Sequence, residues 1–379
     1  MYRDFAVDPA SGAQGDPLTD AYGHGSHVAG IIAGGLPSGG DGRVELRVAE
    51  NVSLPAVLGT DTELFDLARL RDRDAELVKT RELEQLGQRE VADPIRLDGI
   101  ARRCRLVSLK VLNEQGTGRS SDVIRALRYV REDLNQDGRK LVVHGVNLSL
   151  GYDFNAKAFA CGQTPICVEV NRLVQSGVVA VAAAGNTGHG TVTGLFGQRE
   201  GTLLSTINDP GNAAEAITVG STHRDMPHVY GVSWFSSKGP TGNAERAITV
   251  GSTHRDMPHT YGVSYFSSKG PTADGRPKPD LVAPGEQIAS CAAGGSLKLV
   301  YGDTRPPAGH VTYVTDSGTA MACAHVSGAV AAFLSVHREF LGRPDDTKRI
   351  FLENATSLGR TAEFQGRGLV DLMRALQAV

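Results

Sequence analysis

The sequence predicts a doubly wound α/β fold, with a mostly parallel central sheet covered by helices on both faces. Short apolar stretches alternate with helical stretches, which is the βαβα pattern of such folds. The run Val178–Ala184 is apolar throughout, so both faces of that strand should be buried. Ligands of these sheets bind beyond the carboxyl ends of the strands, and the motifs described below fall at such ends.

The alternating elements begin near residue 106. Strands are expected at Leu106–Leu112, Leu141–Leu150 and Val178–Ala184, with helices at Ser121–Asp133 and Val168–Ser176 between them. The chain has 379 residues, of which 40% are hydrophobic, so it can bury a substantial core. We expect a single large domain over residues 1–379, with two interruptions.

The charge balance excludes some classes of partner. Lys and Arg total 39 against 42 Asp and Glu, a net charge of -3, and they form no basic cluster. We therefore expect no nucleic-acid partner and no membrane partner. The apolar runs, such as 177–185, are too short to span a bilayer. The first residues carry no basic-then-apolar signal, so the location of the protein stays open.

Cysteine usage is sparse. The chain has five cysteines, an odd number, which does not make a disulfide-rich scaffold. Cys161 and Cys167 are close enough in sequence for a local bridge. The alternative is that these two, like the other three, are free thiols.

The first interruption is a charged insertion at about 41–98. It begins with apolar residues alternating at Val44, Leu46 and Val48, which predicts a short strand or hairpin. Thr62–Val91 then combines many charges with a partial stripe of leucines, which predicts a helix. This helix either packs on the domain with a solvated face or docks a partner or an internal regulator.

The second interruption is a tandem duplication of 31 residues, at 211–241 and 242–272. The copies differ only at Ala214/Glu245, Glu215/Arg246, Val229/Thr260 and Trp234/Tyr265. One sheet has room for one Ile-Thr-Val-Gly strand, so only one copy can occupy it. We expect the second copy, Ile248–Gly251, in the core because it continues directly towards the residues after 272.

Four short motifs carry the chemistry. Residues 23–30, Gly-His-Gly-Ser-His-Val-Ala-Gly, open a helix of small residues, and residues 317–322, Ser-Gly-Thr-Ala-Met-Ala, turn into a second such helix. The strand before residue 185 ends in Gly185-Asn186, which puts a side-chain amide donor where an oxyanion hole needs one. Residues 147–151 end the preceding strand and could form one wall of a cleft.

Together these stretches resemble the subtilase family of serine proteases. The matching segments are HGSHVAG at 24–30, SLG at 149–151, AAGN at 183–186, KPDLVAPG at 278–285 and SGTAMA at 317–322. The resemblance runs from Asp20 to about Gln377, apart from the two interruptions. It implies a subtilisin-like fold and a serine endopeptidase that hydrolyses peptide bonds through an Asp-His-Ser triad and an oxyanion hole.

The resemblance assigns roles by position. His24 would be the general base and Asn186 the oxyanion donor. The walls of the first specificity pocket would be Ser149, Leu150 and Gly151 on one side and Ala183, Ala184 and Gly185 on the other. Gly116, Thr117 and Gly118 resemble the edge strand that pairs with an extended peptide, so the expected partner is a peptide or protein substrate. The chemistry requires no cofactor. A structural calcium ion is compatible with the family and is not visible in the sequence.

The chain departs from the family at Ala320, which stands at the position of the nucleophilic serine. No hydroxyl is available there, and Ser317 and Thr319 lie at other points of the same turn. We therefore expect this chain to be inactive as written. Either an engineered substitution disables a protease, or the chain is a natural pseudoprotease that acts as a peptide-binding or regulatory module.

A second departure lies at the amino end, where the family has a strand carrying Asp-Ser/Thr-Gly. No such strand is expected before His24, and we assign the triad role to none of Asp4, Asp8, Asp16 and Asp20. The aspartate strand is then either truncated away or supplied by a separate segment, such as an amino-terminal segment or propeptide. Without it the central sheet would lack one strand and expose an edge.

The preference of the first pocket can be argued only from its surroundings. Thr187 follows Asn186, so no carboxylate stands there to attract a basic side chain. Tyr152 and Phe154 either line an apolar subsite or pack on the surface. We expect a broad preference for apolar or aromatic side chains.

Overall fold

The computed structural model describes most of the chain. The described residues are 2–6, 16–35, 46–50, 57–59, 97–153, 155, 157–194, 197–223, 263–264, 266–286, 288–301 and 311–379. The predicted helix at Thr62–Val91, Asp8 and Phe154 lie outside these ranges.

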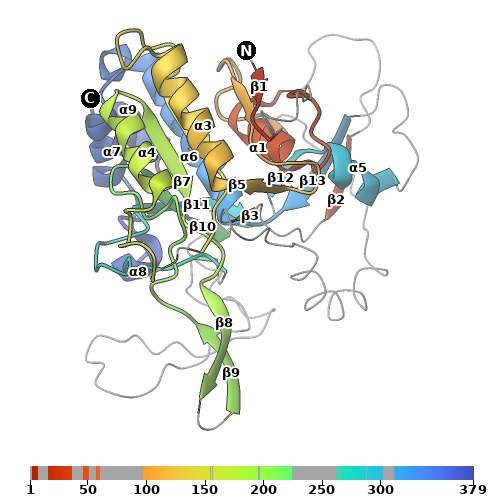
Figure 1. Cartoon of the computed structure of the whole chain (residues 1–379), viewed down its shortest axis with the longest axis vertical. Helices are drawn as coiled ribbons and strands as arrows, with labels where there is room; N and C mark the ends of the chain where they lie inside the picture. Colours follow the sequence, from red (N-terminus) through yellow and green to blue (C-terminus); the bar gives the residue numbers. More distant parts are fainter. Residues whose placement is uncertain are drawn as a thin grey trace.

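A parallel sheet of four strands forms the centre of the molecule, in the order β11-β10-β7-β6 (Figure 1). Its strands are β6 Gly145–Leu148, β7 Val179–Ala183, β10 Ile217–His223 and β11 Leu281–Glu286. All three neighbouring pairs are parallel, so the strands end at the same edge. The doubly wound α/β prediction is confirmed.

Helices cover both faces of this sheet, as the apolar run at Val178–Ala184 predicts. Val179, Val181 and Ala183 pack with α6, Thr319–Val336, on one face. Ala180 and Ala182 pack on the other face with α3, Ser120–Arg128, and α4, Pro165–Gln175. Alternate side chains of β7 therefore pack in two separate apolar cores, which explains why every residue of this strand is apolar.

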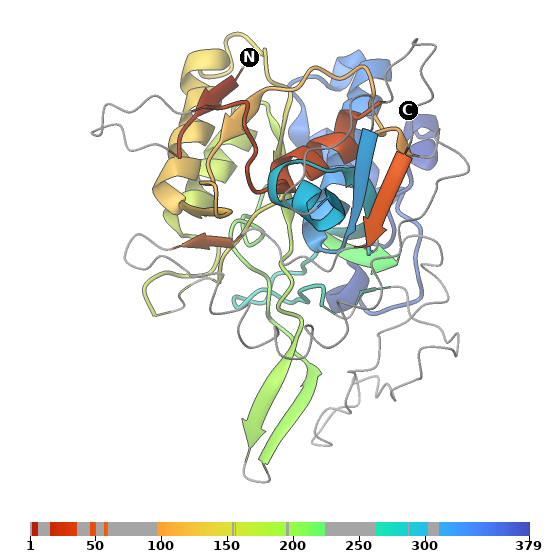
Figure 2. The same cartoon turned by 90° about the vertical axis from the view of Figure 1, so that its right-hand side faces the viewer.

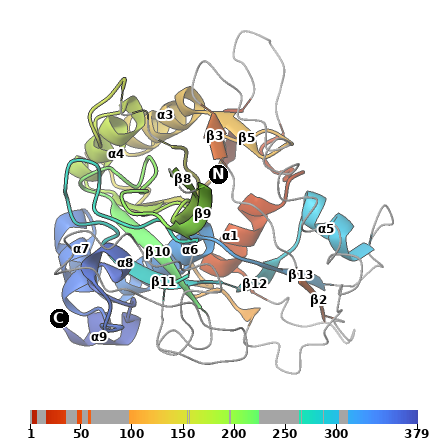
Figure 3. The ribbon, with the colours of Figure 1, turned by 90° about the horizontal axis from the view of Figure 1, so that it is seen from below.

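The predicted helix at Ser121–Asp133 is present as α3 followed by a π-helical segment, η3 Tyr129–Leu134. Helix α1, His24–Ala33, packs against α6 through Val28, Ile31 and Ala324 (Figure 3). By length and composition α6 could cross a membrane, but about two-thirds of it is buried inside the protein. It is the core helix of this fold.

A short strand lies ahead of His24, where the sequence showed none. β1, Tyr2–Asp4, pairs in parallel with β4, Ser108–Lys110. It escaped prediction because its three residues are polar or exposed and its partner lies about a hundred positions away. Within the described ranges, no strand pairs with both β4 and β6, although Leu109 and Leu148 belong to the same apolar cluster.

The remaining elements flank this body. Strand β2, Leu46–Glu50, confirms the strand expected from the alternation at Val44–Val48. It runs parallel to β13, Val311–Asp316, which pairs with β12, Ile288–Cys291, beside α5, Gly294–Tyr301 (Figure 2). The carboxyl-terminal part holds η4 Arg338–Phe340, α7 Pro344–Glu353, α8 Ala362–Gln365 and α9 Leu372–Gln377.

A two-stranded hairpin projects from the same end of the body as the carboxyl ends of the sheet strands (Figures 1 and 2). It consists of β8, His189–Gly194, and β9, Gly197–Thr202, which pair antiparallel. The hairpin begins three residues after Asn186. Its base is closed by two backbone bonds, from Leu203 N to Gly188 O at 2.9 Å and from Gly188 N to Phe266 O at 3.0 Å.

The copy of the duplicated segment that lies in the sheet is not the one we expected. The sheet position between β7 and β11 is filled by the first copy, as β10. Ile248–Gly251, which we expected there, lies outside the described residues. The second copy contributes its last part instead: Ser264 N donates to Ser221 O at 2.7 Å, and Ser267 Oγ accepts from Ser221 N at 3.0 Å. The packed unit is therefore a hybrid of the two copies.

The residues just before β10 differ between the two copies. A contact made by one of them, Glu215, favours the first copy in the sheet. Glu215 Oε1 accepts a hydrogen bond from Gln175 Nε2 at 2.8 Å. The equivalent residue of the second copy, Arg246, cannot accept this bond. It would also add a cation beside Lys348, whose Nζ already donates to the carbonyls of Ala214 and Ala216.

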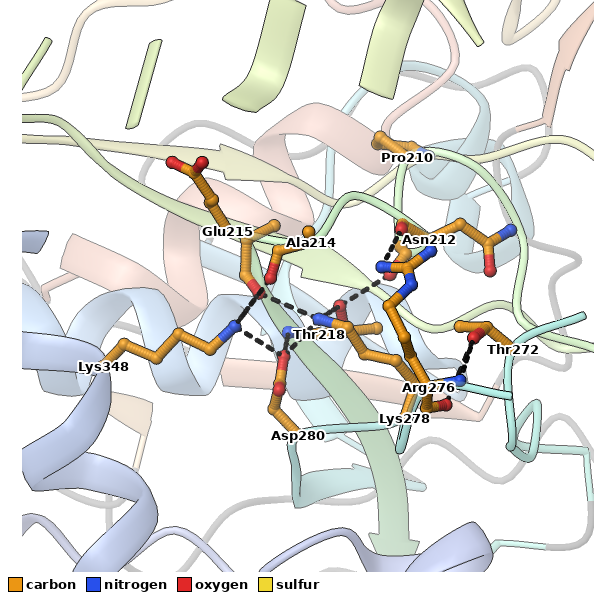
Figure 4. A network of polar contacts seen from close by, with 12 residues as sticks. Pro210, Asn212, Ala214, Glu215, Thr218, Thr272, Arg276, Lys278, Asp280 and Lys348 are labelled. Carbon is orange, nitrogen blue, oxygen red and sulfur yellow. Dashed lines mark hydrogen bonds and ion pairs between the residues drawn. The ribbon is translucent and has the colours of Figure 1, made fainter. Parts of the chain in front are cut away.

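A network of charged side chains also holds the start of β10 in place (Figure 4). Lys278 Nζ lies 2.5 Å from Asp280 Oδ2 and donates to Thr218 Oγ1 at 2.8 Å. Lys348 Nζ, from α7, lies 3.4 Å from the same carboxylate. Burial lowers the pKa of Lys278 to about 8, against the opposing pull of Asp280. β10 is thus tied to β11 and α7 by side chains as well as by its ladder.

Candidate active site

His24 is the first residue of α1 and follows a tight turn. Gly23 has φ of 101°, and a side chain on it would run into the carbonyl oxygen of Ala293, so only glycine fits. Asp20 holds the turn: its Oδ1 accepts from Gly23 N and its Oδ2 from Ser26 N, both at 2.7 Å. The carboxylate thereby satisfies amides at the helix start that would otherwise be unpaired.

The His24 ring is neutral at ordinary pH. Burial lowers its pKa to about 4, although the charge of Asp20 acts in the opposite direction. Its Nε2 atom is buried and has no hydrogen-bond partner among the described residues. A buried nitrogen of this kind is costly unless something completes it.

None of the described carboxylates at the amino end makes a hydrogen bond to this ring. Asp4 Oδ1 accepts from Ala6 N, and its other oxygen lies 3.8 Å from Lys110 Nζ. Asp16 accepts from Leu18 N and from the Thr19 hydroxyl, which lowers its pKa. Asp20 has both oxygens engaged in the turn described above.

The end of β7 and the start of α6 meet through Asn186. Asn186 Oδ1 accepts from Thr319 N at 2.9 Å and from Thr319 Oγ1 at 3.0 Å. Thr319 Oγ1 in turn accepts from Gly185 N at 3.1 Å. These bonds fix the carboxamide and leave Asn186 Nδ2 without a partner among the described residues, on the side of Gly318.

Ala320 is the second residue of α6 and is fully buried. Its carbonyl oxygen accepts from Ser149 Oγ at 2.7 Å, which joins the α6 turn to the segment after β6. Ser149 is oriented by Asn147, whose Nδ2 donates to Ser149 Oγ at 2.9 Å. Position 320 is therefore in direct contact with one predicted wall and next to the residue that holds Asn186.

The two predicted walls lie on neighbouring strands. Ser149–Gly151 follows β6 and Ala183–Gly185 ends and follows β7, and the register pairs Leu148 with Ala182. Tyr152 lines no open subsite, since it is buried in the apolar core and bridges to Asp209 through backbone bonds of 3.0 Å in each direction. Both alternatives for Tyr152, an apolar subsite and packing on the surface, are therefore wrong.

The predicted edge, Gly116–Gly118, is not free. β5, Thr117–Arg119, runs parallel to β3, Val57–Gly59, which belongs to the charged insertion. Gly116 lies against the ring of Tyr22, two residues before His24, so the edge is close to the start of α1. The insertion thus contributes a strand at the place where sequence similarity puts an extended peptide.

Sequence reasoning passed over two residues that the geometry brings forward. The sequence marks Thr319 only as a neighbour of Ala320 in the same turn, whereas its hydroxyl donates to Asn186 Oδ1 and orients that carboxamide. Asn208 lies between the two walls and carries no motif at all. A polar residue in a loop that contacts two strand ends leaves no periodic signal, so only the structure could find it.

The described residues include no group of three or more His, Cys, Asp or Glu side chains arranged to hold a metal ion. The expectation of a calcium site stays a prediction. Cys161 and Cys167 are both free thiols, so the local bridge is not formed, and the other three cysteines are free as well.

Comparisons with known proteins agree with this geometry. The subtilase family model matches residues 2–369, nearly the whole chain. The chain belongs to the subtilase family. This subtilase is 28% identical to pyrolysin of Pyrococcus furiosus over 94% of the chain and 21% of pyrolysin. It is 29% identical to serine protease AprX of Bacillus subtilis over 68% of the chain and 48% of that protein.

Solved structures support the same fold. Sphericase aligns with a TM-score of 0.51 and 21% sequence identity, over 93% of the chain and 74% of sphericase.

Subtilisin E of Bacillus subtilis is 26% identical over 74% of the chain and 51% of its own length. The subtilase described here thus spans about half, or less, of the length of these curated relatives.

Proposed function

We propose that this chain is a serine endopeptidase domain whose chemistry is blocked by Ala320, and that it binds extended peptides without cleaving them efficiently. One observation carries the proposal: Asn186, Thr319 and Ala320 are joined at the meeting point of β7 and α6, with a free amide donor at Asn186. A serine at position 320 would stand at a helix start beside this donor. That is the arrangement acyl transfer requires.

His24 is proposed as the base that takes the proton from this serine. Its buried, unpartnered Nε2 has the lone pair for that task. With a pKa of about 4, however, the ring is a weak base. A carboxylate bonded to the ring would raise that pKa and fix the tautomer, which is the role of the triad acid.

The acid is proposed to come from a segment other than the described Asp4, Asp16 and Asp20, since these carboxylates are engaged elsewhere. β4 and β6 are each paired on one side only within the described residues. An apolar strand ending in Asp-Ser/Thr-Gly, placed between them, would complete the sheet. Its carboxylate would then end at the same edge as His24.

The decisive experiment restores serine at position 320. The parent chain should show almost no peptidase activity, and Ala320→Ser should turn over slowly. Adding the aspartate strand, fused or in trans, should raise turnover by roughly 10⁴, since in a subtilisin loss of the acid alone costs about that factor. Parent activity blocked by a fluorophosphonate would refute the role of position 320. Equal rates for Ala320→Ser with and without the added strand would show that the acid is already present.

A second function, a non-catalytic peptide-binding module, is favoured by Ala320 itself. It keeps the two walls and loses the nucleophile. The codon at position 320 of the source gene separates the two functions. Serine there identifies a disabled enzyme, and alanine identifies a natural pseudoprotease.

A further inference from the structure

Strand β3 brings the charged insertion to the edge that the family resemblance assigns to an extended peptide. It pairs in parallel with β5 over three positions, with Leu58 opposite Gly118 (Figure 3). Residues 51–56 join it to β2, which is itself paired along its whole length with β13. The sequence alone leaves open whether this insertion packs on the domain, docks a partner or acts as an internal regulator.

β5 has only one side on which another strand can pair. In an extended strand the amide and the carbonyl of one residue point to the same side, and those of the next residue point to the opposite side. The carbonyl of Thr117 accepts from Asn113 N at 2.7 Å, and its amide donates to Asn113 Oδ1 at 3.1 Å. The backbone groups of Gly118 therefore face the other side, which is where β3 lies.

β3 and a bound peptide consequently need the same backbone groups. An extended peptide that adds to the edge of a sheet bonds to the amides and carbonyls of that edge, whatever side chains it carries. On the open side of β5 these are the groups of Gly118, opposite Leu58 of β3. A peptide and β3 cannot occupy this edge at the same time.

The pairing of β3 is weak enough to be reversed. Among the described residues β3 has no second strand partner, and a parallel pair of three positions is marginal by itself. Because β3 belongs to the same chain, however, it faces β5 at an effective concentration on the order of 1 mM. A free peptide has to compete with that concentration, and it can do so by contacting the two walls as well as the edge.

We propose that β3 is an internal inhibitor of peptide binding: it closes the β5 edge, and an extended peptide binds there only when β3 leaves. The inference rests on the proposed function and adds its regulation. It makes the charged insertion an internal regulator. The apparent affinity of the chain for a peptide is then reduced by the fraction of molecules in which β3 has left the edge.

Two neighbouring proline substitutions test the pairing. Since Gly118 faces β3, the parallel ladder turns the amide of Gly59 towards β5 and the amide of Leu58 away from it. Gly59→Pro therefore removes a donor to β5, whereas Leu58→Pro removes an amide that faces away and is the matched control.

The probe is a fluorescein-labelled peptide, Ala-Ala-Ala-Phe-Ala-Ala, and fluorescence anisotropy measures its dissociation constant for the full chain. We expect Gly59→Pro to bind the probe about fivefold more tightly than the parent, the effect of one lost hydrogen bond in β3. Leu58→Pro should bind it as the parent does.

Hydrogen exchange at the Gly118 amide reports the position of β3 without any peptide. This amide should be protected in the parent and in Leu58→Pro, and it should exchange about fivefold faster in Gly59→Pro. Saturating Gly59→Pro with the probe should slow the exchange again, because the peptide then takes the place of β3.

The results separate the inference from the proposed function. Unchanged affinity in Gly59→Pro, or equal tightening by both prolines, would overturn the inference, while binding of the probe would still support the proposed function. An unprotected Gly118 amide in the parent would show that β3 does not hold the edge. If neither the parent nor Gly59→Pro bound the probe, both would be overturned. Tighter binding and faster exchange in Gly59→Pro alone would establish β3 as the inhibitor.

Discussion

Asp20 is the residue that fixes the turn into α1. Its two oxygens accept from Gly23 N and Ser26 N across a helix start that has no other side-chain cap. Gly23 itself has left-handed backbone geometry, which glycine adopts without strain. The position of the proposed base therefore depends on a carboxylate that never bonds its ring.

Replacing Asp20 tests this dependence. Asp20→Ala should lower the free energy of unfolding by about 1–2 kcal/mol, the usual cost of losing a helix cap. It should also increase hydrogen exchange at the amides of Gly23 and Ser26. Asp16→Ala is the matched control, because Asp16 is exposed and also caps a turn. A smaller loss for Asp20→Ala than for the control would contradict the assignment.

At the scale of elements, the duplication sets two nearly identical strands in competition for one place between β7 and β11. The ladder bonds and the Thr218–Lys278 bond do not distinguish them, because the strand residues are the same in both copies. The only differing side chain with a described contact is Glu215, bonded to Gln175. One hydrogen bond therefore biases the choice.

Exchanging this pair should move the strand. In the double variant Glu215→Arg with Arg246→Glu, the second copy gains the acceptor for Gln175 and the first copy loses it. Because the exchange takes a hydrogen bond of about 1 kcal/mol from one arrangement and gives it to the other, the ratio of the two arrangements should shift by about 30-fold. Hydrogen exchange should then show protection moving from Thr218 and Val219 towards Thr249 and Val250.

The control exchanges another of the differing pairs, Val229→Thr with Thr260→Val, which leaves the Glu215–Gln175 bond unaltered. Protection should stay on the first copy in that variant. Unchanged protection in the Glu215–Arg246 exchange would show that the order of the chain, and not this contact, selects the strand.

The sequence was enough to predict an element wherever its local pattern is compatible with only one structure. The apolar run at Val178–Ala184 predicts β7 because both its faces are buried, and the small residues after His24 predict a tightly packed helix. It did not predict pairings between segments that lie far apart in the sequence. These are β1 with β4, β3 with β5, and the strand of the first copy, rather than the second, with β7. Asn208 escaped for the same reason, since its contacts with Gly185 and Gly151 exist only once both walls are assembled.

At the scale of the molecule, two histidines are held in neutral form near the α1–α6 contact, His24 partly buried and His27 buried. His27 is almost fully buried, and its Nε2 lies 3.1 Å from Ile288 O and 3.0 Å from Val314 O. Carbonyls only accept, so Nε2 carries the proton and Nδ1 is bare. Burial lowers the pKa of His27 to about 4, and the nearby His24 and His325 act in the same direction.

This burial predicts acid sensitivity. In the unfolded chain these histidines bind protons near their ordinary pKa of 6.5, whereas in the folded chain they stay neutral until the pH falls to about 4. Stability should therefore be complete above pH 6.5 and fall as the pH drops towards 4. His27 alone accounts for about 3 kcal/mol of that loss.

Urea unfolding between pH 7.5 and 4 measures the effect. His27→Gln keeps a donor for the two carbonyls and removes the titration, so its stability should fall less steeply than that of the parent over this range. The slope is the readout, because the substitution also changes the absolute stability. Equal slopes would mean that His27 is accessible to protons in the folded state.

The hybrid packing of the two copies has a consequence for chain entropy. The packed parts are residues 211–223 of the first copy and 263–272 of the second, apart from 265, and together they cover 22 of the 31 positions of one unit. The connection between them, 224–262, is 39 residues long, and a chain with one unit would span the same two points with 8. Closing the longer connection costs about 1.4 kcal/mol more. Recombination between the repeats, which would leave a single unit, would shorten this connection by 31 residues and keep every contact described for the two copies.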